Sequence, residues 1–186
     1  MARERGVDPG MVHMANSAGL LAAKDLADAL PEAGVVRPGL MLYGVSPAPH
    51  LAAELTPVMT LSSRVVQVRR LRAGEAVGYG ATHRAARDTV VATLPIGYAD
   101  GVPVSSSNRG RVLLGGRFAP LVGRVSMDFI TIDAGDARVA IGDEAILFGE
   151  GQGARLPVEE AAAAAETISY ELLIRVGARV PRVIES

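Results

Sequence analysis

Residues 110–127 read GRVLLGGRFAPLVGRVSM, in which two short apolar segments meet at a pair of glycines. Gly115 and Gly116 are a signal for a tight hairpin turn, because the central residues of such turns need positive φ angles, which glycine adopts without steric cost. Short apolar segments on either side of such a turn are typical of strands. The stretch therefore predicts a β-hairpin in the second half of the chain.

The same pattern continues on both sides of this hairpin. Short β-branched segments separated by glycine, proline and aspartate lie at residues 58–71, 89–97, 129–135 and 144–149. Residues 156–177 differ, because their apolar spacing predicts one helix that starts near Pro157 and ends at Gly177. Residues 178–186 are expected to form a last strand. This half should be mainly β.

The N-terminal part has a different organisation. MVHMAN at 11–16 predicts a short strand, Ser17 is placed to cap a helix, and helical apolar spacing continues from there to residue 34. A second apolar segment, VVRPGLMLYG, comes next at 35–44. A strand, a helix and a second apolar segment in this order resemble a βα unit of a parallel sheet or barrel.

The proline-bearing stretch VSPAPHLAAELTP, residues 45–57, is typical of a domain boundary. The predicted fold class is a mainly β C-terminal domain preceded by a fragment of an α/β (TIM-type) barrel. The expected domains are the barrel fragment at residues 1–50 and the β domain at residues 51–186.

Composition excludes several classes of function. The 186 residues carry 19 basic and 20 acidic side chains, a balance that disfavours a nucleic-acid partner. The lack of cysteine excludes disulfides, thiolate metal sites and a cysteine nucleophile, and the three histidines lack ligand spacing, so no metal is expected. No apolar stretch reaches the roughly 18 residues of a membrane span, and the N-terminus lacks the apolar segment of a secretory signal. We expect no membrane contact and a cytoplasmic location.

Four short motifs come one after another along the chain, supported by two more: HMANSAG at 13–19, RPGLMLYG at 37–44, GYGATHRA at 78–85 and GYADGVP at 97–103, with GRVSMD at 123–128 and ETISYE at 166–171. This ordered set resembles the alanine racemase family, pyridoxal-phosphate enzymes that interconvert L- and D-alanine. The resemblance covers the C-terminal half of such an enzyme: the end of its cofactor-binding barrel and its whole β-rich domain. It implies an isomerase that supplies D-alanine for cell-wall peptidoglycan.

The resemblance implies five residues that hold pyridoxal 5'-phosphate: Ser17, Arg37, Gly39, Leu40 and Tyr170. Ser17, Gly39 and Leu40 would bind the phosphate, since barrel strand ends and helix N-termini collect such groups, and Tyr170 would support it. Arg37 would face the pyridine nitrogen. Because arginine stays protonated, it leaves that nitrogen unprotonated, which weakens the ring as an electron sink and favours reprotonation of the α-carbon. Without the resemblance, Ser17 is a plain N-cap and Tyr170 a packed helix residue.

Tyr79 lies between two glycines in GEAVGYGATHRA, residues 74–85, where a bend or a close backbone approach is expected. Racemisation needs an acid or base on each face of the α-carbon, and Tyr79 resembles the family's catalytic base on one face. An isolated phenol has a pKa of about 10, so a nearby cation or histidine must help it to lose its proton. In the family this tyrosine enters the active site of the other subunit, which implies a homodimer.

Two further residues are implied to contact the substrate, alanine. Tyr98 resembles the residue that narrows substrate entry to the active site, and Met127 resembles the one whose backbone N–H binds the substrate carboxylate. Asp128 matches the family pattern beside it. His83 and Arg84 are expected to be solvated loop residues. His13 is expected to order the barrel rather than to bind a metal.

In the family, a lysine near the start of the barrel holds the cofactor aldehyde as a Schiff base, and no segment of this sequence matches that region. The sole lysine, Lys24, lies outside every matching motif and is expected on a helix surface. We therefore expect this chain alone to be inactive.

Two alternatives stay open. One is a racemase of serine or another small amino acid, or a decarboxylase of the same fold, although such decarboxylases use an active-site cysteine that this chain lacks. The other is a non-catalytic β domain that folds, dimerises and binds nothing.

Overall fold

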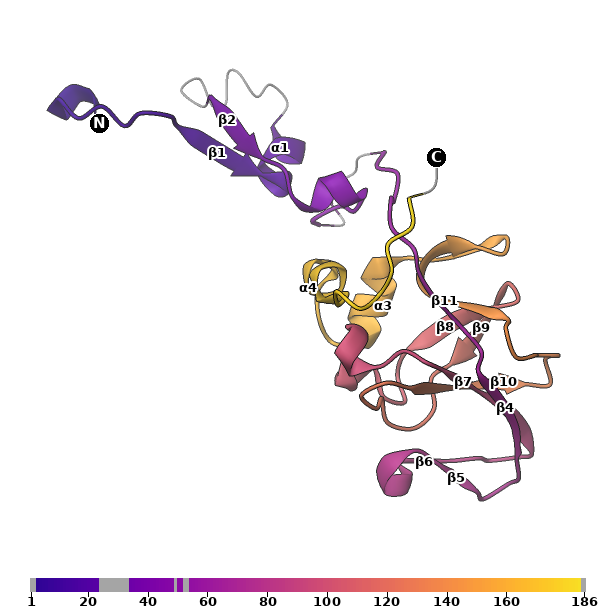
Figure 1. Cartoon of the computed structure of the whole chain (residues 1–186). Coiled ribbons are helices and arrows are strands. Elements are labelled where there is room, and N and C mark those ends of the chain that lie inside the picture. The colour runs from indigo at the N-terminus through magenta and orange to yellow at the C-terminus, as the bar shows by residue number, and fades with distance from the viewer. Residues whose placement is uncertain (1–2, 24–33, 49, 52–53, 185–186) are drawn as a thin grey trace. The chain divides into compact units, whose positions relative to one another are not determined.

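The structure is a computed structural model that describes residues 3–23, 34–48, 50–51 and 54–184 (Figure 1). The chain divides into two compact units, Met1–Val58 and Met59–Ser186. The first contains a small α/β element and the second is built mainly of strands, which confirms the predicted fold class.

The first unit contains the predicted strand, helix and second strand. Strand β1 (His13–Asn16) leads into helix α1 (Ser17–Ala22), and β1 pairs in parallel with β2 (Val35–Arg37). The described residues of this unit also form two short 3₁₀ helices, η1 (Arg3–Arg5) and η2 (Leu40–Tyr43). The rest of the predicted helix, with Lys24, lies outside the described residues.

The prediction that Ser17 caps α1 is wrong. The N-cap is Asn16, whose side-chain oxygen accepts a hydrogen bond from the Gly19 N–H at 3.0 Å. Ser17 is the first helical residue and is buried in the unit, with 2% of its surface exposed. An asparagine at the cap frees the serine hydroxyl for other partners.

The strands of the second unit are β3 (Leu61–Arg64), β4 (Gln67–Leu71), β5 (Ala76–Val77), β6 (His83–Arg84), β7 (Thr89–Leu94), β8 (Arg111–Leu114), β9 (Arg117–Pro120), β10 (Ile130–Gly135), β11 (Glu144–Gly151) and β12 (Ala154–Leu156). Its helices are α3 (Val158–Ala164), α4 (Ser169–Arg175) and the 3₁₀ turns η3 (Tyr79–Ala81), η4 (Tyr98–Asp100) and η5 (Val104–Ser106).

These strands form antiparallel sheets. One sheet has the order β10-β7-β4, and another has the order β12-β11-β8-β9 with β3 also paired to β11. The predicted hairpin is confirmed, because β8 and β9 pair across Gly115 and Gly116, whose φ angles are +58° and +74°. A bridge between Leu121 and Ile132 joins the end of that hairpin to β10.

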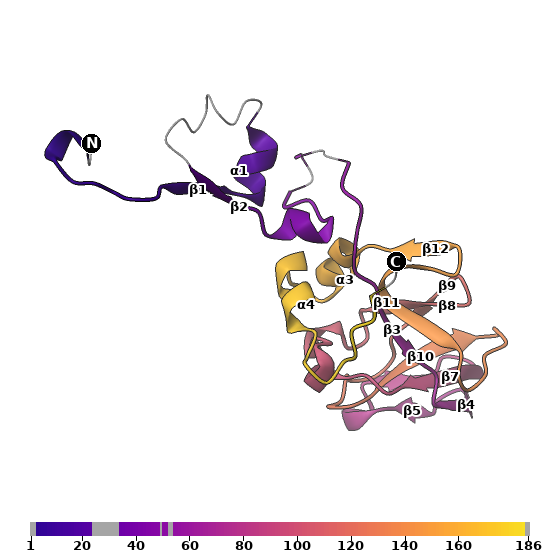
Figure 2. The same ribbon diagram turned by 45° about the horizontal axis from the view of Figure 1, so that its top comes forward.

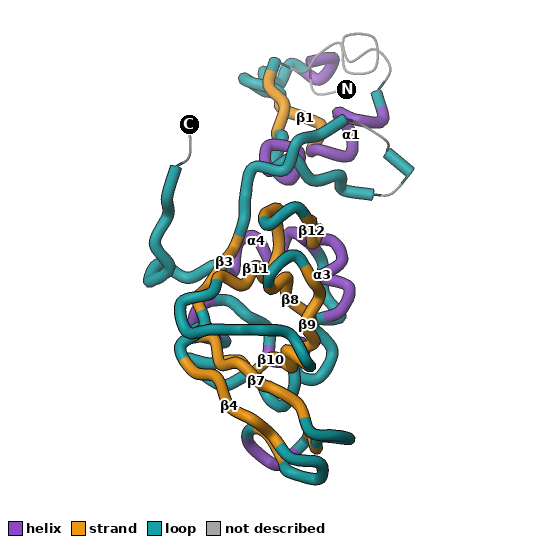
Figure 3. The backbone as a smooth tube through the Cα atoms, turned by 90° about the vertical axis from the view of Figure 1, so that its right-hand side faces the viewer, coloured by secondary structure: helices purple, strands orange, loops and turns teal. Residues whose placement is uncertain are grey.

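The core lies on the inner faces of these sheets. Buried side chains from β4, β5 and β7 pack together with neighbouring loop residues as Leu71, Val77, Ala85, Val91 and Val122. A second cluster joins Leu113, Ile146 and Leu156. Helices α3 and α4 pack on each other, and α3 packs on β11. Figures 2 and 3 show these helices at one end of the unit, with the small β5–β6 hairpin at the other.

The predicted single helix over 156–177 is wrong, because the chain breaks between α3 and α4. Glu166 has a φ of +54°, and the N–H groups of Glu166 and Thr167 donate to the carbonyls of Ala163 and Ala162. These bonds are those of a Schellman C-cap, which normally carries glycine at the position of Glu166. The carboxylate of Glu166 instead forms an ion pair with Arg109 at 2.6 Å.

The predicted C-terminal strand is also wrong for the described residues 178–184. The Val180 N–H donates to the Gly177 carbonyl in a turn, and Pro181 has no N–H to offer a ladder. Arg182 donates to the carbonyls of Val176, Gly177 and Val180 at 2.6–2.7 Å. These carbonyls are therefore satisfied without a neighbouring strand.

Candidate functional site

Tyr79 lies at the tip of the β5–β6 hairpin. Gly78 and Gly80 on either side have φ angles of +74° and +72°, so both adopt the left-handed region that favours glycine. At Gly78 a Cβ would also lie 3.2 Å from the backbone nitrogen of Arg124. The two glycines thus turn the chain tightly and leave 74% of the Tyr79 surface exposed.

The base of the same hairpin is a pair of short strands rather than a loop. His83 and Arg84 form β6, where they pair with Val77 and Ala76, so the expectation that they lie in a loop is wrong, although Arg84 is exposed as expected. The Arg84 guanidinium donates to the Gly74 carbonyl at 3.0 Å. Within the described residues, no hydrogen bond reaches the Tyr79 hydroxyl.

Tyr98 and Met127 lie on adjoining segments although they are far apart in sequence. The Tyr98 N–H donates to the Ser126 carbonyl and the Ala99 N–H donates to the Met127 carbonyl, both at 3.0 Å. Gly97 permits this approach, because a Cβ there would lie 2.5 Å from the carbonyl carbon of Met127. About half of each residue's surface, 50% for Tyr98 and 52% for Met127, is exposed.

The segment 126–129 is a tight turn with two backbone donors that have no acceptor among the described residues. Ser126 Oγ accepts from the Phe129 N–H at 3.0 Å and donates to the Phe129 carbonyl at 2.9 Å. Within the described part of the chain, the N–H groups of Met127 and Asp128 donate to no acceptor. Two free successive N–H groups form a site where an anion such as a carboxylate can bind.

Asp128 does not stand free beside these donors, because Arg179 reaches it from the C-terminal segment. The Arg179 Nη2 lies 2.7 Å from the Asp128 carboxylate and 3.1 Å from that of Asp100, while the Arg179 Nε lies 2.6 Å from Asp100. Neither Arg179 nor Asp100 was predicted from the sequence as a site residue. The motif GYADGVP contains Asp100, but no local pattern marks Arg179.

Asp100 is the most buried of these charged groups, with 10% of its side chain exposed. Burial acts to raise the pKa of Asp100, but hydrogen bonds from Arg179 and the Gly97 N–H and the charge of Arg179 prevail, so its pKa lies below the ordinary value. The same contacts with Asp100 and Asp128 raise the pKa of Arg179. Asp100 and Arg179 are therefore charged at neutral pH.

Tyr170 lies in the first turn of α4 and is 40% exposed. The end of α4 is tied to the η4 turn, because the Gly177 N–H donates to the Asp100 carbonyl at 3.0 Å. Gly101, with a φ of +115°, leaves no room for a Cβ beside the Arg175 carbonyl. Three predicted site segments, those of Tyr98, Met127 and Tyr170, are thus connected within the second unit.

The first unit brings its four predicted cofactor residues together. Ser17 Oγ accepts from the N–H groups of Gly39 at 2.9 Å and Met41 at 3.2 Å. The N–H of Leu40 between them donates to no described residue, and the space at Gly39 is open. A buried hydroxyl and backbone donors at the start of a helical turn are the groups that bind phosphate. Arg37 lies just before this turn, and its guanidinium contacts His13 Nδ1 and lies 3.2 Å from the His13 carbonyl.

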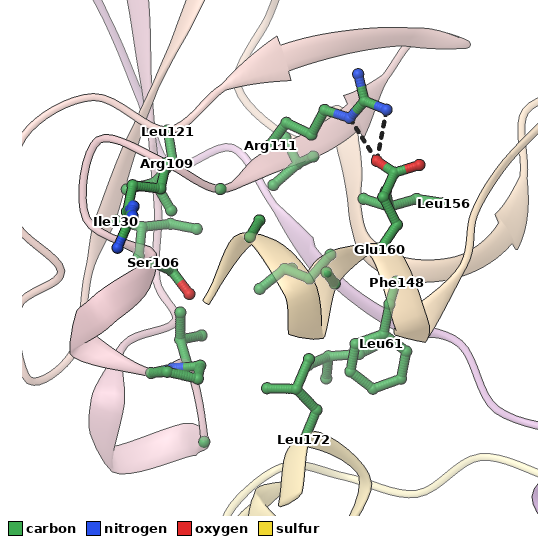
Figure 4. Close-up of a pocket in the computed structure, with 18 residues that line it drawn as sticks. Leu61, Ser106, Arg109, Arg111, Leu121, Ile130, Phe148, Leu156, Glu160 and Leu172 are labelled. Carbon is green, nitrogen blue, oxygen red and sulfur yellow. Dashed lines mark hydrogen bonds and ion pairs between the residues drawn. The ribbon is translucent and has the colours of Figure 1, made fainter. Parts of the chain in front are cut away.

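A cavity of about 290 Å³ lies in the second unit between α3, α4 and the sheets (Figure 4). Its walls are mostly apolar and include Leu61, Phe148 and Leu172, while the Arg111–Glu160 ion pair spans 2.5 Å at one side. None of the sequence-predicted site residues lines it. The predicted site residues therefore lie outside the lining of this cavity, although Gly101 at the end of the η4 turn forms part of its wall.

The described residues contain no group of three or more histidine, cysteine, aspartate or glutamate side chains that is placed to hold a metal ion. None of the described helices has the length and apolar character needed to cross a membrane.

Comparison with known families matches both units. The family described as alanine racemase, C-terminal domain, matches residues 58–184, and the one described as alanine racemase, N-terminal domain, matches residues 1–47.

Single proteins agree with the family matches. An alanine racemase from Frankia casuarinae is 43% identical over 188 residues, covering 98% of this chain and 47% of that protein. The crystal structure of alanine racemase from Streptomyces lavendulae has a TM-score of 0.86 at 40% identity and covers 98% and 47% of the two chains. The Bartonella henselae enzyme, solved with covalently bound pyridoxal phosphate, has a TM-score of 0.83 at 35% identity and covers 97% and 48%. The chain spans about half the length of the curated relatives it matches.

Proposed function

Since this chain belongs to the alanine racemase family, we propose that it forms the C-terminal part of an enzyme that interconverts L- and D-alanine with pyridoxal phosphate. The observation that carries the proposal is Tyr79, an exposed tyrosine on a glycine-built hairpin tip within a family motif. Through D-alanine the reaction would serve cell-wall synthesis.

Tyr79 is the proposed catalytic residue on one face of the substrate α-carbon. As a phenolate, its oxygen would take the α-proton from one enantiomer of alanine; as a phenol, it would donate a proton to the α-carbon when that enantiomer is formed. A phenol performs this step at neutral pH only beside a cation or a hydrogen-bonding histidine. No described residue hydrogen-bonds to the Tyr79 hydroxyl. The cation or histidine that promotes its deprotonation would therefore come from outside the second unit of the same chain.

The two free N–H groups support a binding site for the substrate carboxylate. Met127 would donate its N–H to that carboxylate, and Asp128 would flank it. Tyr98, on the adjoining turn, would narrow the entry, which suits an amino acid with a side chain as small as a methyl group. The exposed positions of Tyr98 and Met127 are compatible with contact to a ligand.

The phosphate of the cofactor would bind at Ser17, Gly39 and Leu40, whose buried hydroxyl and backbone donors suit a phosphate. When bound, pyridoxal phosphate would supply a ring that withdraws electrons from the substrate and acidifies its α-proton. Arg37 would donate a hydrogen bond to the ring nitrogen, and Tyr170 would support the phosphate from α4. The contact of Arg37 with His13 would orient its guanidinium.

A homodimer is the proposed assembly. The hairpin that carries Tyr79 and the helix α4 that carries Tyr170 lie at opposite ends of the second unit (Figures 1 and 3). Two groups so placed would serve two different sites, with Tyr79 entering the active site of a second copy. Lys24 is the sole lysine here and lies outside every motif that matches the family. The lysine that carries the cofactor would therefore belong to the half of the relatives that the match does not cover.

The test is a chimaera in which the unmatched N-terminal part of the Frankia casuarinae relative precedes this chain. With pyridoxal phosphate we expect alanine racemisation by the chimaera and none by the 186-residue chain alone. In the chimaera, Tyr79→Phe should lower the rate about a hundredfold or more and leave the cofactor absorbance unchanged. The control His83→Gln, on the same hairpin, should retain activity.

Other outcomes separate the alternatives. Racemisation of serine in preference to alanine would replace the proposed substrate by another small amino acid. A chimaera that carries the cofactor but racemises neither would favour a non-catalytic β domain. Loss of cofactor binding in Tyr79→Phe, as large as the loss of rate, would contradict the role of Tyr79 as a base.

A further inference from the structure

Arg179 connects three segments that are distant in sequence. Its guanidinium joins the C-terminal segment to Asp100, 79 residues away, and to Asp128, 51 residues away. Asp100 is the last residue of the η4 turn that carries Tyr98, and Asp128 comes directly after Met127. One side chain thus links the two segments proposed to contact the amino-acid substrate.

The backbone around Arg179 is held by its own contacts. Arg182 donates to the carbonyls of Val176, Gly177 and Val180, which lie on both sides of Arg179 in sequence. Asp100 accepts a second hydrogen bond, from the Gly97 N–H at 2.8 Å, so its carboxylate also connects Arg179 to the start of the η4 turn. Arginine suits this position, because its planar fork donates to two carboxylates at once.

The charge of Arg179 also affects the electrostatics at the two free N–H groups. The free N–H groups of Met127 and Asp128 lie next to the Asp128 carboxylate, which is 48% exposed. An unpaired carboxylate here would repel the carboxylate of an incoming amino acid. The single positive charge of Arg179 is shared between Asp100 and Asp128, so it lowers the negative charge that Asp128 presents while leaving the two N–H groups open to a ligand.

We propose that Arg179 is a positioning residue for the amino-acid substrate: it holds the Met127–Asp128 turn against the Tyr98 turn and reduces the negative charge of Asp128 beside the carboxylate site. This inference rests on the proposed function. It predicts that Arg179 acts on substrate affinity through Asp128 and Asp100 and touches neither the cofactor nor the α-carbon.

The test compares Arg179→Gln, Arg179→Lys and the control Arg70→Gln, an exposed arginine on β4. In the 186-residue chain, amide hydrogen exchange at Gly97 and Ala99 should become at least about tenfold faster in Arg179→Gln and stay unchanged at Val91 in β7. In the chimaera, KM for alanine should rise about tenfold with kcat within about twofold. Arg179→Lys should recover part of the affinity, since it keeps the charge but loses the fork.

The outcomes separate the inference from the proposed function. A chimaera without any activity would overturn the proposed function, and the positioning role would fall with it. An active chimaera whose KM is unchanged by Arg179→Gln would overturn the positioning role alone. A fall in the kcat of Arg179→Gln as large as its rise in KM would also overturn the positioning role. So would a loss confined to thermal stability that Arg179→Lys does not relieve.

Discussion

The Ser17 Oγ accepts a hydrogen bond from the Gly39 N–H at 2.9 Å, although 22 positions separate the two residues in sequence. This bond joins the start of α1 to the start of η2 and places a buried hydroxyl among backbone donors.

Ser17→Ala should weaken pyridoxal-phosphate binding by the chimaera, because it removes a hydroxyl from the proposed phosphate site and leaves the Gly39 N–H without its acceptor. We expect about a tenfold rise in the cofactor Kd and a loss of about 1–2 kcal/mol in the free energy of unfolding. Titration of the cofactor absorbance measures the first quantity. Ser62→Ala, an exposed serine on β3, is the control, and equal effects of both variants would contradict the assignment.

The Asp100 ion pair should make the second unit sensitive to acid. Because the pKa of Asp100 is lowered on folding, its contribution to stability is fully present above its ordinary pKa of 3.8. The contribution is lost as the pH falls through the lower value of the folded state. Asp100→Asn should therefore cost about 1–2 kcal/mol at neutral pH and much less at the acid end of the transition.

Urea unfolding of wild type and Asp100→Asn between neutral pH and pH values below the ordinary pKa of 3.8 measures this difference. Asp136→Asn is the control, because Asp136 forms only an exposed pair with Arg87 at 3.6 Å. A constant difference between wild type and Asp100→Asn across the whole pH range would show that charge is not the cause.

Gly101→Ala should destabilise the unit more than Gly74→Ala. Both glycines have positive φ angles, +115° and +85°, so alanine is strained at either position. At Gly101 the new Cβ would also lie 2.5 Å from the Arg175 carbonyl oxygen, whereas the space at Gly74 is open. We expect a loss of about 1 kcal/mol for Gly74→Ala and at least about 1–3 kcal/mol more for Gly101→Ala. Chemical denaturation of both variants measures their free energies of unfolding and shows which substitution is the more destabilising.

Filling the cavity beneath α3 should stabilise the second unit. Ala161 lines the cavity of about 290 Å³, and a leucine there would place three more carbons among Leu, Val and Phe side chains. The expected gain is about 1–2 kcal/mol. Ala163→Leu on the exposed face of the same helix should change the free energy of unfolding by no more than about 0.5 kcal/mol. A loss of stability in Ala161→Leu alone would mean that the walls leave no room for the side chain.

Much of the fold can be predicted from local pattern. The Gly115–Gly116 pair predicted the β8–β9 hairpin, and the spacing of apolar residues predicted β1, α1 and most strands of the second unit. Turns and strands of this kind depend on φ preferences and side-chain alternation over a few residues, which the sequence displays directly.

The predictions that are wrong concern positions where a tertiary contact or an unusual backbone conformation prevails over the local sequence preference. Glu166 occupies a helix-ending position that usually carries glycine, so nothing in the sequence marks the break between α3 and α4. Asn16 displaces Ser17 as the cap, which leaves the serine hydroxyl for the η2 backbone. At the C-terminus, Arg182 binds the carbonyls that a strand would have offered to a neighbour.

The amino-acid sequence by itself determined the class of each half and, through its ordered motifs, the family and the candidate residues from Ser17 to Tyr170. Tertiary structure alone decided how these residues are held: Tyr79 on a glycine-built tip, free N–H groups at Met127 and Asp128, and Arg179 between Asp100 and Asp128. The physical reason is distance along the chain. Hydrogen bonds across 51 or 79 residues depend on how the sheets bring the chain together, and no local preference encodes them.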